Sequence, residues 1–451
     1  MKLSKTKVTT FIAFLGMLLL CVSDLAGRPQ QEHVTAKATC ASLPFPSGLT
    51  YIGGLNDGSR LTNGLGNALN VQRMTLGTTD VLVIAAGQNG NGSLTLEIYF
   101  VDPNTGGLLD GTNIGSATQV QPHLSPYVSV AIRSISGGDV NADGIPDFAL
   151  GSPAGVAFAL VGAVSNGILS YQVISLPAPA NTNGFGASTA MGNLDSIPGD
   201  EIVVGATGGS RVVGKVSIFA YDGIGFTNTL TIPSPIPNSR LDDLFGSGVA
   251  VGNVTGSTAN DLIVGASGST VNGAGGAGRV YVFPDPVYAS NFQTLVTGIK
   301  GDEFGSSVAT ANVDGGVADV IGATSNYSSN PRANVYSGPT SSGQQPAFVL
   351  TPLSGRSGLW AVGASGDLNG DGLDEVLIGA ATGCSGTGYL YLSDGSMPLT
   401  TRLAFQPPSA SKFGSSIANG PGTRLFFVGD SLVTVGSTYQ GNGQVYVFKV
   451  N

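Results

Sequence analysis

The sequence predicts an all-β protein that folds as a seven-bladed β-propeller built from repeats. Three observations indicate this fold. Glycine makes up 69 of the 451 residues while only 10% are charged, a pattern of about sixty residues recurs along the chain, and the units show no helical periodicity. Glycine supplies the positive φ angles that tight turns require, so this composition is typical of many short strands joined by turns. An apolar fraction of 41% argues against disorder.

The N-terminus is predicted to be a secretory signal. Three lysines near the start precede an apolar run from Phe11 to Val22 and a stretch of small residues that ends at Gly27. The apolar run is short for a membrane span. We therefore expect a signal peptide over residues 1–27, an N-terminal segment over 28–47, and a propeller over 48–451. A short N-terminal membrane anchor is the alternative. The mature protein is expected to be secreted or at the cell surface, with no membrane span.

Self-similarity along the chain carries the fold prediction. Phe-Gly pairs followed by small residues begin at Phe185, Phe245, Phe304 and Phe413, and the first three are 60 and 59 residues apart. Leu65 and Leu359 begin weaker copies. A second mark is an apolar strand that ends in Gly-Ala or Gly-Ser. The glycines of this second mark are Gly151, Gly205, Gly265, Gly322, Gly379 and Gly436. An imperfect first copy of this mark lies near Ala85, and an aromatic, β-branched strand follows each of the seven copies. The three marks together give seven units.

Units of this length cannot bury their apolar faces alone. Radial packing of the sheets buries both faces of each and leaves short protected edges, which is the β-propeller arrangement. The early strand-like stretch from Gly48 to Leu55 is expected to join the last unit and close the ring. Closure would remove an open sheet edge.

Phe-Gly, a Gly-Asp loop and Gly-Ala, repeated seven times, resemble the FG-GAP repeat. The chain looks like the N-terminal seven-bladed propeller of integrin α subunits over residues 48–451. It also resembles the propeller of a glycan-anchor-specific phospholipase D, whose catalytic domain has no counterpart here. The resemblance implies β-hairpin loops that bind calcium within the blades, and a ligand that meets the opposite face.

Two loops carry a complete set of oxygen ligands. They place oxygen-bearing side chains at positions 1, 3, 5 and 9 and a backbone carbonyl at position 7. This pattern favours calcium, a hard cation, while a helix-flanked calcium loop would need a glutamate at position 12, where apolar residues stand. An acid-rich solvated turn is the alternative. The predicted ligands are Asp139, Asn141, Asp143, Ile145 and Asp147 in the first loop, and Asp367, Asn369, Asp371, Leu373 and Glu375 in the second.

Three further units keep fragments of the loop. Because neutral oxygens replace charged ones, these loops are expected to be hydrogen-bonded turns with weak affinity for a cation at most. The possible weak ligands are Asn193, Asp195 and Glu201 in the third unit and Asn312, Asp314 and Asp319 in the fifth. The fourth unit has Asn253, Thr255, Ser257 and Asp261.

Exported chains tend to pair their cysteines, so Cys40 and Cys384 are expected to form a disulfide, with two free thiols as the alternative. Asn91, Asn253 and Asn326 match the glycosylation tripeptide.

The sequence predicts a module that binds calcium and that recognises or adheres to an extracellular protein or glycan. It does not predict an enzyme. The net charge of −9 argues against nucleic-acid binding. Only His33 and His123 could serve as a base, and no nucleophile motif lies near them. Carboxylate pairs before two Phe-Gly marks, such as Asp302-Glu303, leave a secreted glycan hydrolase open as an alternative. A purely structural scaffold in the matrix or at the cell surface is the second alternative.

Overall fold

The computed structural model divides the chain into two compact units, Met1–Ala41 and Ser42–Asn451. The residues that the structure describes are 46–55, 66–87, 96–109, 132–152, 155–166, 168–209, 212–236, 243–324, 331–351, 361–364, 366–381, 387–392, 401–405, 412–435 and 438–451. Within these ranges, no helix is long and apolar enough to cross a membrane.

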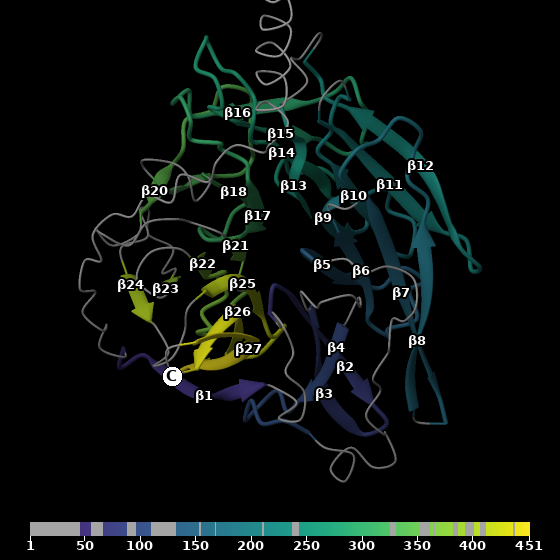
Figure 1. The fold of residues 1–451 in the computed structure, drawn as a ribbon, viewed down its shortest axis with the longest axis vertical. Helices are drawn as coiled ribbons and strands as arrows, with labels where there is room; N and C mark the ends of the chain where they lie inside the picture. Colours follow the sequence, from purple (N-terminus) through teal and green to yellow (C-terminus); the bar gives the residue numbers. More distant parts are fainter. Residues whose placement is uncertain are drawn as a thin grey trace, which may run out of the picture. The chain divides into compact units, whose positions relative to one another are not determined.

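The described strands form seven antiparallel sheets, which we number in chain order (Figure 1). Sheet one has β2 (Ala68–Leu76), β3 (Thr79–Gly87) and β4 (Leu96–Val101), and sheet two has β5 (Ser134–Gly138), β6 (Asp147–Ser152), β7 (Val156–Ser165) and β8 (Ile168–Leu176). Sheet three has β9 (Phe185–Gly192), β10 (Glu201–Ala206), β11 (Lys215–Tyr221) and β12 (Phe226–Pro233), and sheet four has β13 (Phe245–Gly252), β14 (Asp261–Ala266), β15 (Arg279–Phe283) and β16 (Gln293–Val296). Sheet five has β17 (Ser307–Ala311), β18 (Asp319–Ala323), β19 (Ala333–Tyr336) and β20 (Phe348–Leu350), and sheet six has β21 (Ala361–Ala364), β22 (Val376–Ala380), β23 (Thr387–Leu392) and β24 (Thr401–Phe405). Sheet seven has β25 (Phe413–Asn419), β26 (Leu425–Val435), β27 (Thr438–Val450) and β1 (Leu49–Leu55).

The structure is an all-β propeller, and its described residues form six complete four-stranded blades where the sequence predicted seven blades. Sheet one differs because only three of its strands, β2, β3 and β4, are described. A fourth strand would have to follow β4, and residues 110–131 lie outside the described part of the chain. The single antiparallel bridge from Val101 to Leu108 is the described pairing beyond β4.

The first strand closes the ring, as the sequence predicted. β1 pairs antiparallel with β27 in sheet seven, from Leu49 opposite Val450 to Leu55 opposite Val445. The ring of Tyr51 packs on that of Phe448, with centroids 5.6 Å apart. Sheet seven is therefore built from both ends of the unit, which leaves β27 with a partner on each side.

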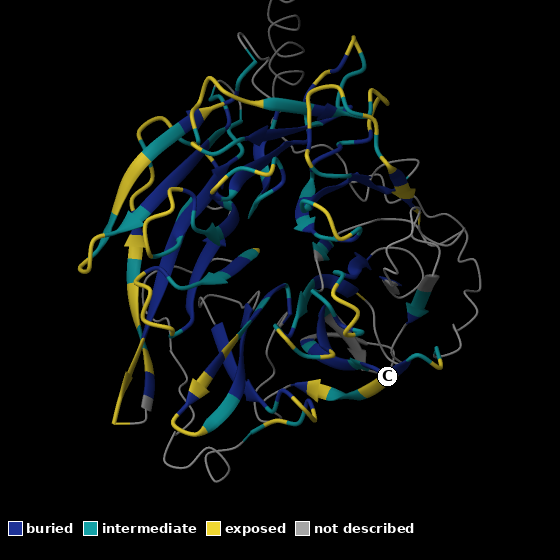
Figure 2. Ribbon diagram, turned by 180° about the vertical axis from the view of Figure 1, so that it is seen from behind, coloured by how far each residue is buried: buried dark blue, intermediate teal, exposed yellow. Residues whose placement is uncertain are grey.

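The inner strands of the sheets contact one another in chain order. β2, β5, β9, β13, β17, β21 and β25 each contact the next, and β25 contacts β2. A buried apolar cluster lies between each successive pair of sheets, and the cluster between sheets seven and one completes the series. Second strands such as β6, β10, β14, β18 and β22 are buried at every position, which explains their continuous apolar sequences (Figure 2).

The two sequence marks meet at the boundaries between sheets. A Cβ added to Gly205 would lie 2.3 Å from the carbonyl oxygen of Gly246, the Phe-Gly glycine of the next sheet. The same approach is 1.9 Å between Gly265 and Gly305. Glycine is required because the neighbouring backbone occupies the space that a side chain would need. Equivalent contacts join Gly151 to Gly186, Gly379 to Gly414 and Gly429 to Gly66.

One repeat mark was placed wrongly in the sequence. Gly436 was expected to be the glycine of the seventh unit, but Gly429 packs against Gly66 and lies opposite Ser416, as Gly205 lies opposite Ser188 in sheet three. Gly436 itself lies outside the described residues. Gly436 is followed by a serine, as the Gly-Ala or Gly-Ser mark requires, whereas Gly429 is followed by Asp430, so the sequence mark alone favoured Gly436.

Hydroxyl groups join neighbouring sheets at the same boundaries. Ser188 Oγ donates to the Gly246 carbonyl at 2.8 Å, and Ser247 Oγ donates to the Gly305 carbonyl at 3.1 Å. Ser416 Oγ donates to the Gly66 carbonyl at 2.7 Å, which ties sheet seven to sheet one. The small residues after each Phe-Gly pair thus pack closely and also hydrogen-bond to the next sheet.

Candidate functional site

The predicted cation loops connect the first two strands of their sheets. The first loop follows Gly138 at the end of β5 and ends at Asp147, where β6 begins. The second loop follows β21 and ends just before Val376, where β22 begins. Both loops therefore lie at the C-terminal ends of inner strands, as β-hairpin turns.

The first loop folds its side chains back onto its own backbone. The two carboxylate oxygens of Asp139 accept hydrogen bonds from the N–H groups of Asp143 (3.1 Å) and Gly144 (2.8 Å). Asp143 Oδ1 accepts from Ile145 N at 2.8 Å, and Asn141 Oδ1 accepts from Asp143 N at 3.2 Å. Gly144 has a φ of 78°, which lets the chain turn at this point.

The second loop repeats this geometry. Asp367 accepts hydrogen bonds from the N–H groups of Asp371 (3.0 Å) and Gly372 (2.9 Å), and Asp371 Oδ1 accepts from Leu373 N at 2.9 Å. Gly372 has a φ of 90°. The ligand pattern read from the sequence therefore corresponds to one local conformation, found in sheets two and six.

A buried carboxylate closes each loop. Asp147 is 1% exposed and accepts from Val140 N and Gly162 N, each at 2.7 Å. Glu375 is fully buried and accepts from Leu368 N at 2.6 Å. Burial raises the pKa of Asp147 to about 7, the two N–H donors oppose this rise, and the nearby charges of Asp139 and Asp143 add to it. Such a site disfavours a bare carboxylate and would favour a cation beside it.

The donor chemistry fits a hard cation, but the side chains do not converge. All side-chain donors in both loops are carboxylate or amide oxygens, and each carboxylate oxygen that accepts one N–H keeps a second lone pair. Across the described residues, however, no three carboxylate, imidazole or thiol groups gather closely enough to hold a metal ion. The side-chain oxygens of each loop would therefore have to move closer to one another to coordinate an ion.

The loop of sheet four satisfies its closing carboxylate with hydroxyl groups. Asp261 is fully buried, and its Oδ1 accepts hydrogen bonds from the hydroxyls of Thr255 (3.0 Å) and Ser257 (2.9 Å). The hydroxyl protons therefore occupy the side of the carboxylate that a metal would face. Asn253 Nδ2, the atom that a glycan would modify, donates to the Ser257 carbonyl at 2.6 Å.

The third and fifth loops retain the closing carboxylate without the full ligand set. Glu201 accepts from Leu194 N at 2.7 Å, and Asp319 accepts from Val313 N at 3.0 Å. Burial is the largest cause that raises the pKa of Glu201 to about 7 and that of Asp319 to about 6. The remaining predicted weak ligands accept from the backbone of their own turns. They are Asn193, Asp195, Asn312 and Asp314.

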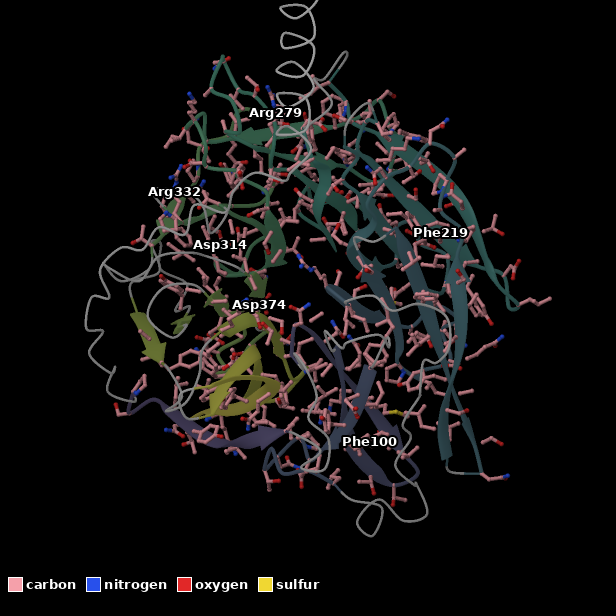
Figure 3. All side chains as sticks on the ribbon, in the orientation of Figure 1. Phe100, Phe219, Arg279, Asp314, Arg332 and Asp374 are labelled. Carbon is pink, nitrogen blue, oxygen red and sulfur yellow. The ribbon has the colours of Figure 1, made fainter. Side chains whose placement is uncertain are left out.

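Side chains at the eighth loop position join neighbouring loops, which sequence reasoning missed. Asp200 Oδ2 accepts from the N–H of Asp139, the first residue of the preceding loop, at 2.9 Å. Asp374, labelled in Figure 3, makes the same bond to Asn312 N at 2.7 Å. Asn260 Nδ2 donates to the Asn193 carbonyl at 2.9 Å. Aligning the loops would have shown a polar residue before the closing carboxylate in three units.

A pocket of about 440 Å³ lies where the inner strands meet. All seven inner strands contribute to it, through residues at or near their N-terminal ends. Because the cation loops follow the C-terminal ends of the same strands, the pocket and the loops lie toward opposite ends of the ring. Arg133 is the one charged residue among the described residues that line it, and hydroxyls such as Ser134 and Ser307 supply much of its polar surface.

Some predicted residues lie outside the described part of the chain. They are Cys40, Cys384, Asn91, Asn326, His33 and His123. The carboxylate Asp302 is 1% exposed and forms an ion pair with Arg332, which is labelled in Figure 3. Asp243 is also buried and accepts hydrogen bonds from Ser234 Oγ and Phe245 N. Asp243 thus accepts a hydrogen bond from the backbone at the start of a Phe-Gly pair.

Two segments of the chain, residues 131–170 and 359–392, match the FG-GAP repeat. They contain the two complete cation loops. No curated protein matches the chain. Among solved structures, the chain is similar to Raptor from Chaetomium thermophilum, with a TM-score of 0.53 and 14% identity over 89% of this chain, which spans 28% of that one. It is also similar to the Dos1 propeller, with a TM-score of 0.47 and 13% identity over 82% of this chain and 75% of that one. The likeness to Raptor concerns the fold alone.

Proposed function

We propose that this chain is a secreted, calcium-binding, seven-bladed FG-GAP propeller that acts as a binding module for an extracellular protein or glycan, and that it is not an enzyme. The observation that carries the proposal is that the two ends of the ring differ. The complete loops lie at one end of the inner strands and a polar pocket at the other. The three-stranded sheet one counts as the seventh blade, since β2 contacts both β5 and β25.

Calcium at the two complete loops would supply positive charge to oxygen atoms that otherwise repel one another. Asp139, Asp143 and Asp147 hold three carboxylates within nine residues, and Asp147 has almost no contact with water. Extracellular modules bind calcium at roughly 0.1–1 mM, so such loops would be filled outside a cell. The loop of sheet four supports this assignment, because a carboxylate there is balanced by hydroxyl donors instead.

The proposed ligand surface surrounds the pocket of about 440 Å³ where the seven inner strands meet, which we call the axial pocket. Its walls are inner strands that neighbouring sheets fix through the serine-to-carbonyl bonds, so the pocket is held in one shape. Arg133 is exposed there and can pair with an acidic group of a ligand. Binding through a preformed pocket costs little ordering entropy. The resemblance to integrin α subunits predicts the same division between ligand face and calcium face.

The calcium part of the proposal is tested by thermal melting. The mature protein is melted with calcium and with a chelator, beside Asp143→Ala and Asp371→Ala. Calcium should raise the melting temperature of the wild type, and each variant should lose part of that increase. Ser257→Ala, in the loop that uses hydroxyls, is the matched control and should keep the calcium response. A melting temperature that ignores calcium in the wild type would exclude both loops.

The ligand part is tested by binding to cells and to an array of glycans in millimolar calcium. Saturable binding that Arg133→Glu reduces and Lys300→Glu leaves unchanged would support the axial pocket. Lys300 is an exposed cation outside the pocket, so it controls for net charge. If no saturable binding occurs, the chain is a scaffold without a specific partner. Turnover of a glycan in the same panel would favour the hydrolase instead.

A further inference from the structure

A second pocket, of about 300 Å³, lies at the seam where sheets seven and one meet. We call it the seam pocket. It is lined by Arg73 of β2, the turn 103–104 after β4, the turn 422–424 before β26, and Lys449 of β27. The turn 422–424 joins the C-terminal end of β25 to β26, so the seam pocket lies toward the cation-loop end of the ring. It shares no described lining residue with the axial pocket.

The seam pocket brings together cationic side chains that are far apart in the sequence. The structure describes nine lysine and arginine side chains, and three of them, Arg73, Arg424 and Lys449, line this one pocket. The net charge of the whole chain is −9. A concentration of positive charge in an acidic protein is a local feature that needs its own explanation.

Two of these cations have no carboxylate partner in the described part of the chain. The ion pairs found there are Arg73 with Asp80 and Arg332 with Asp302. Lys449 Nζ donates one hydrogen bond, to the Asn104 carbonyl at 2.9 Å. Arg424 Nη2 donates one, to the Asn369 carbonyl at 3.2 Å. An ammonium has three donors and a guanidinium five, so both groups keep N–H donors for a further acceptor.

Arg73 has a positioning role in this pocket. Its guanidinium holds Asp80 on one side and donates from Nη1 to the Gly422 carbonyl at 2.9 Å across the seam. A Cβ on Gly422 would lie 2.6 Å from Arg73 Nη1, so the turn approaches the guanidinium closely. The backbone of this turn is fixed further by the bond from Val450 N to the Arg424 carbonyl at 2.9 Å. The seam pocket is therefore a built cavity with fixed walls.

We propose that the seam pocket binds a tetrahedral oxyanion, a sulfate or phosphate group carried on a small polar molecule such as a sugar. Lys449 and Arg424 would donate to the oxyanion, and Arg73 would hold the turn that presents Arg424. Guanidinium and ammonium groups are the usual partners of such anions. A volume near the lower end of the usual ligand range of about 300–1,000 Å³ leaves room for the carrier beside the anion. Bound there, the ligand would bridge the two sheets at which the ring closes.

The experiment measures binding by calorimetry at low ionic strength, where exposed charges are not screened. The probes are glucose 6-sulfate and glucose 6-phosphate, with inorganic sulfate and inorganic phosphate as minimal anions and glucose as the uncharged control. The proteins are the wild type, Lys449→Ala, Arg424→Gln, and Lys300→Ala as an exposed lysine outside the seam pocket. Each is also titrated with calcium, because Arg424 contacts the second loop through Asn369.

Saturable binding of at least one ester, about tenfold weaker in Lys449→Ala and in Arg424→Gln and unchanged in Lys300→Ala, is the expected result. The ester with the lower dissociation constant shows whether the site prefers a sulfate or a phosphate group. Glucose should not bind. Binding that survives both pocket variants, or no binding of any anion, would overturn the proposal. Neither outcome depends on calcium. Absence of anion binding would therefore not contradict the proposed function, and absence of a calcium response would not contradict the anion site in the seam pocket.

Discussion

Asp200 holds the first residue of the neighbouring cation loop, Asp139, by two hydrogen bonds. Its Oδ2 accepts from Asp139 N at 2.9 Å, and its own N–H donates to the Asp139 carbonyl at 2.9 Å. Asp374 and Asn312 repeat both bonds between sheets six and five. We call this pair of hydrogen bonds the clamp. Between Asp200 and Asp139, the clamp fixes the first residue of a complete loop. Between Asp374 and Asn312, the aspartate that makes the clamp is itself part of a complete loop. The proposed calcium sites are therefore tied to their neighbours in the ring.

Removing this clamp should weaken both the fold and the first loop. Asp200→Ala leaves the partly buried N–H of Asp139 without its acceptor, which should lower the unfolding free energy by about 1 kcal/mol. Asp200→Asn keeps an acceptor oxygen and should lose less. Chemical denaturation measures the unfolding free energy, and calcium titration measures the loop. Equal stability of Asp200→Ala and the wild type would show that the clamp contributes nothing.

The close approach between repeat glycines predicts a large effect of one methyl group. Gly265→Ala places a Cβ 1.9 Å from the Gly305 carbonyl oxygen, so sheets four and five must separate. We expect a loss of about 3 kcal/mol, the upper part of the usual range for overpacking. Gly275→Ala, where nothing lies within 4 Å, is the control and should be near neutral. Urea denaturation of the two variants measures the difference, and similar midpoints would contradict the role assigned to the repeat.

The sequence predicted the fold from features that depend on local pattern. Phe-Gly pairs, Gly-Ala strands and the strand at Leu49–Leu55 follow from spacing and hydrophobicity, and the structure confirms the all-β propeller and the closure by β1. The cation loops could also be read locally, because their oxygens fall at alternate positions of one turn. The prediction of seven blades is met by six complete four-stranded sheets in the described part of the chain, because residues 110–131, which follow β4 in sheet one, lie outside it.

Features that depend on neighbours across the ring were missed. The bond from Asp200 to Asp139 joins residues of different units, and the seam pocket joins Arg73 to Lys449 through closure of the ring. No spacing rule connects such residues before the sheets are placed. Gly429 was overlooked for a related reason, because its role is defined by contact with Gly66 and not by its own strand.

The buried closing carboxylates predict how stability depends on pH without calcium. The pKa of Asp147 is about 7 in the folded chain, above its ordinary value of 3.8, and that of Glu201 is raised to about 7 as well. Because the folded state binds these protons more tightly than the unfolded state, their contribution to stability is complete below pH about 4. It is lost as the pH rises through about 7. In chelator, the melting temperature should therefore fall between pH about 5 and about 8.

Calcium should reduce that fall, because a bound cation favours the ionised carboxylate. Melting curves at several pH values, with chelator and with calcium, make the comparison. Asp147→Asn removes one titrating group and should flatten part of the chelator curve. A melting temperature that rises with pH in chelator over this range would contradict the assignment.

Calorimetric titration of calcium into the mature, chelator-treated protein tests the central claim most directly. Two complete loops predict two sites per chain with dissociation constants of roughly 0.1–1 mM. Asp143→Ala should leave one site and Asp371→Ala the other, and the double variant should show none. Heat of binding that is absent in the wild type, or two sites that persist in the double variant, would contradict the proposal that sheets two and six hold calcium.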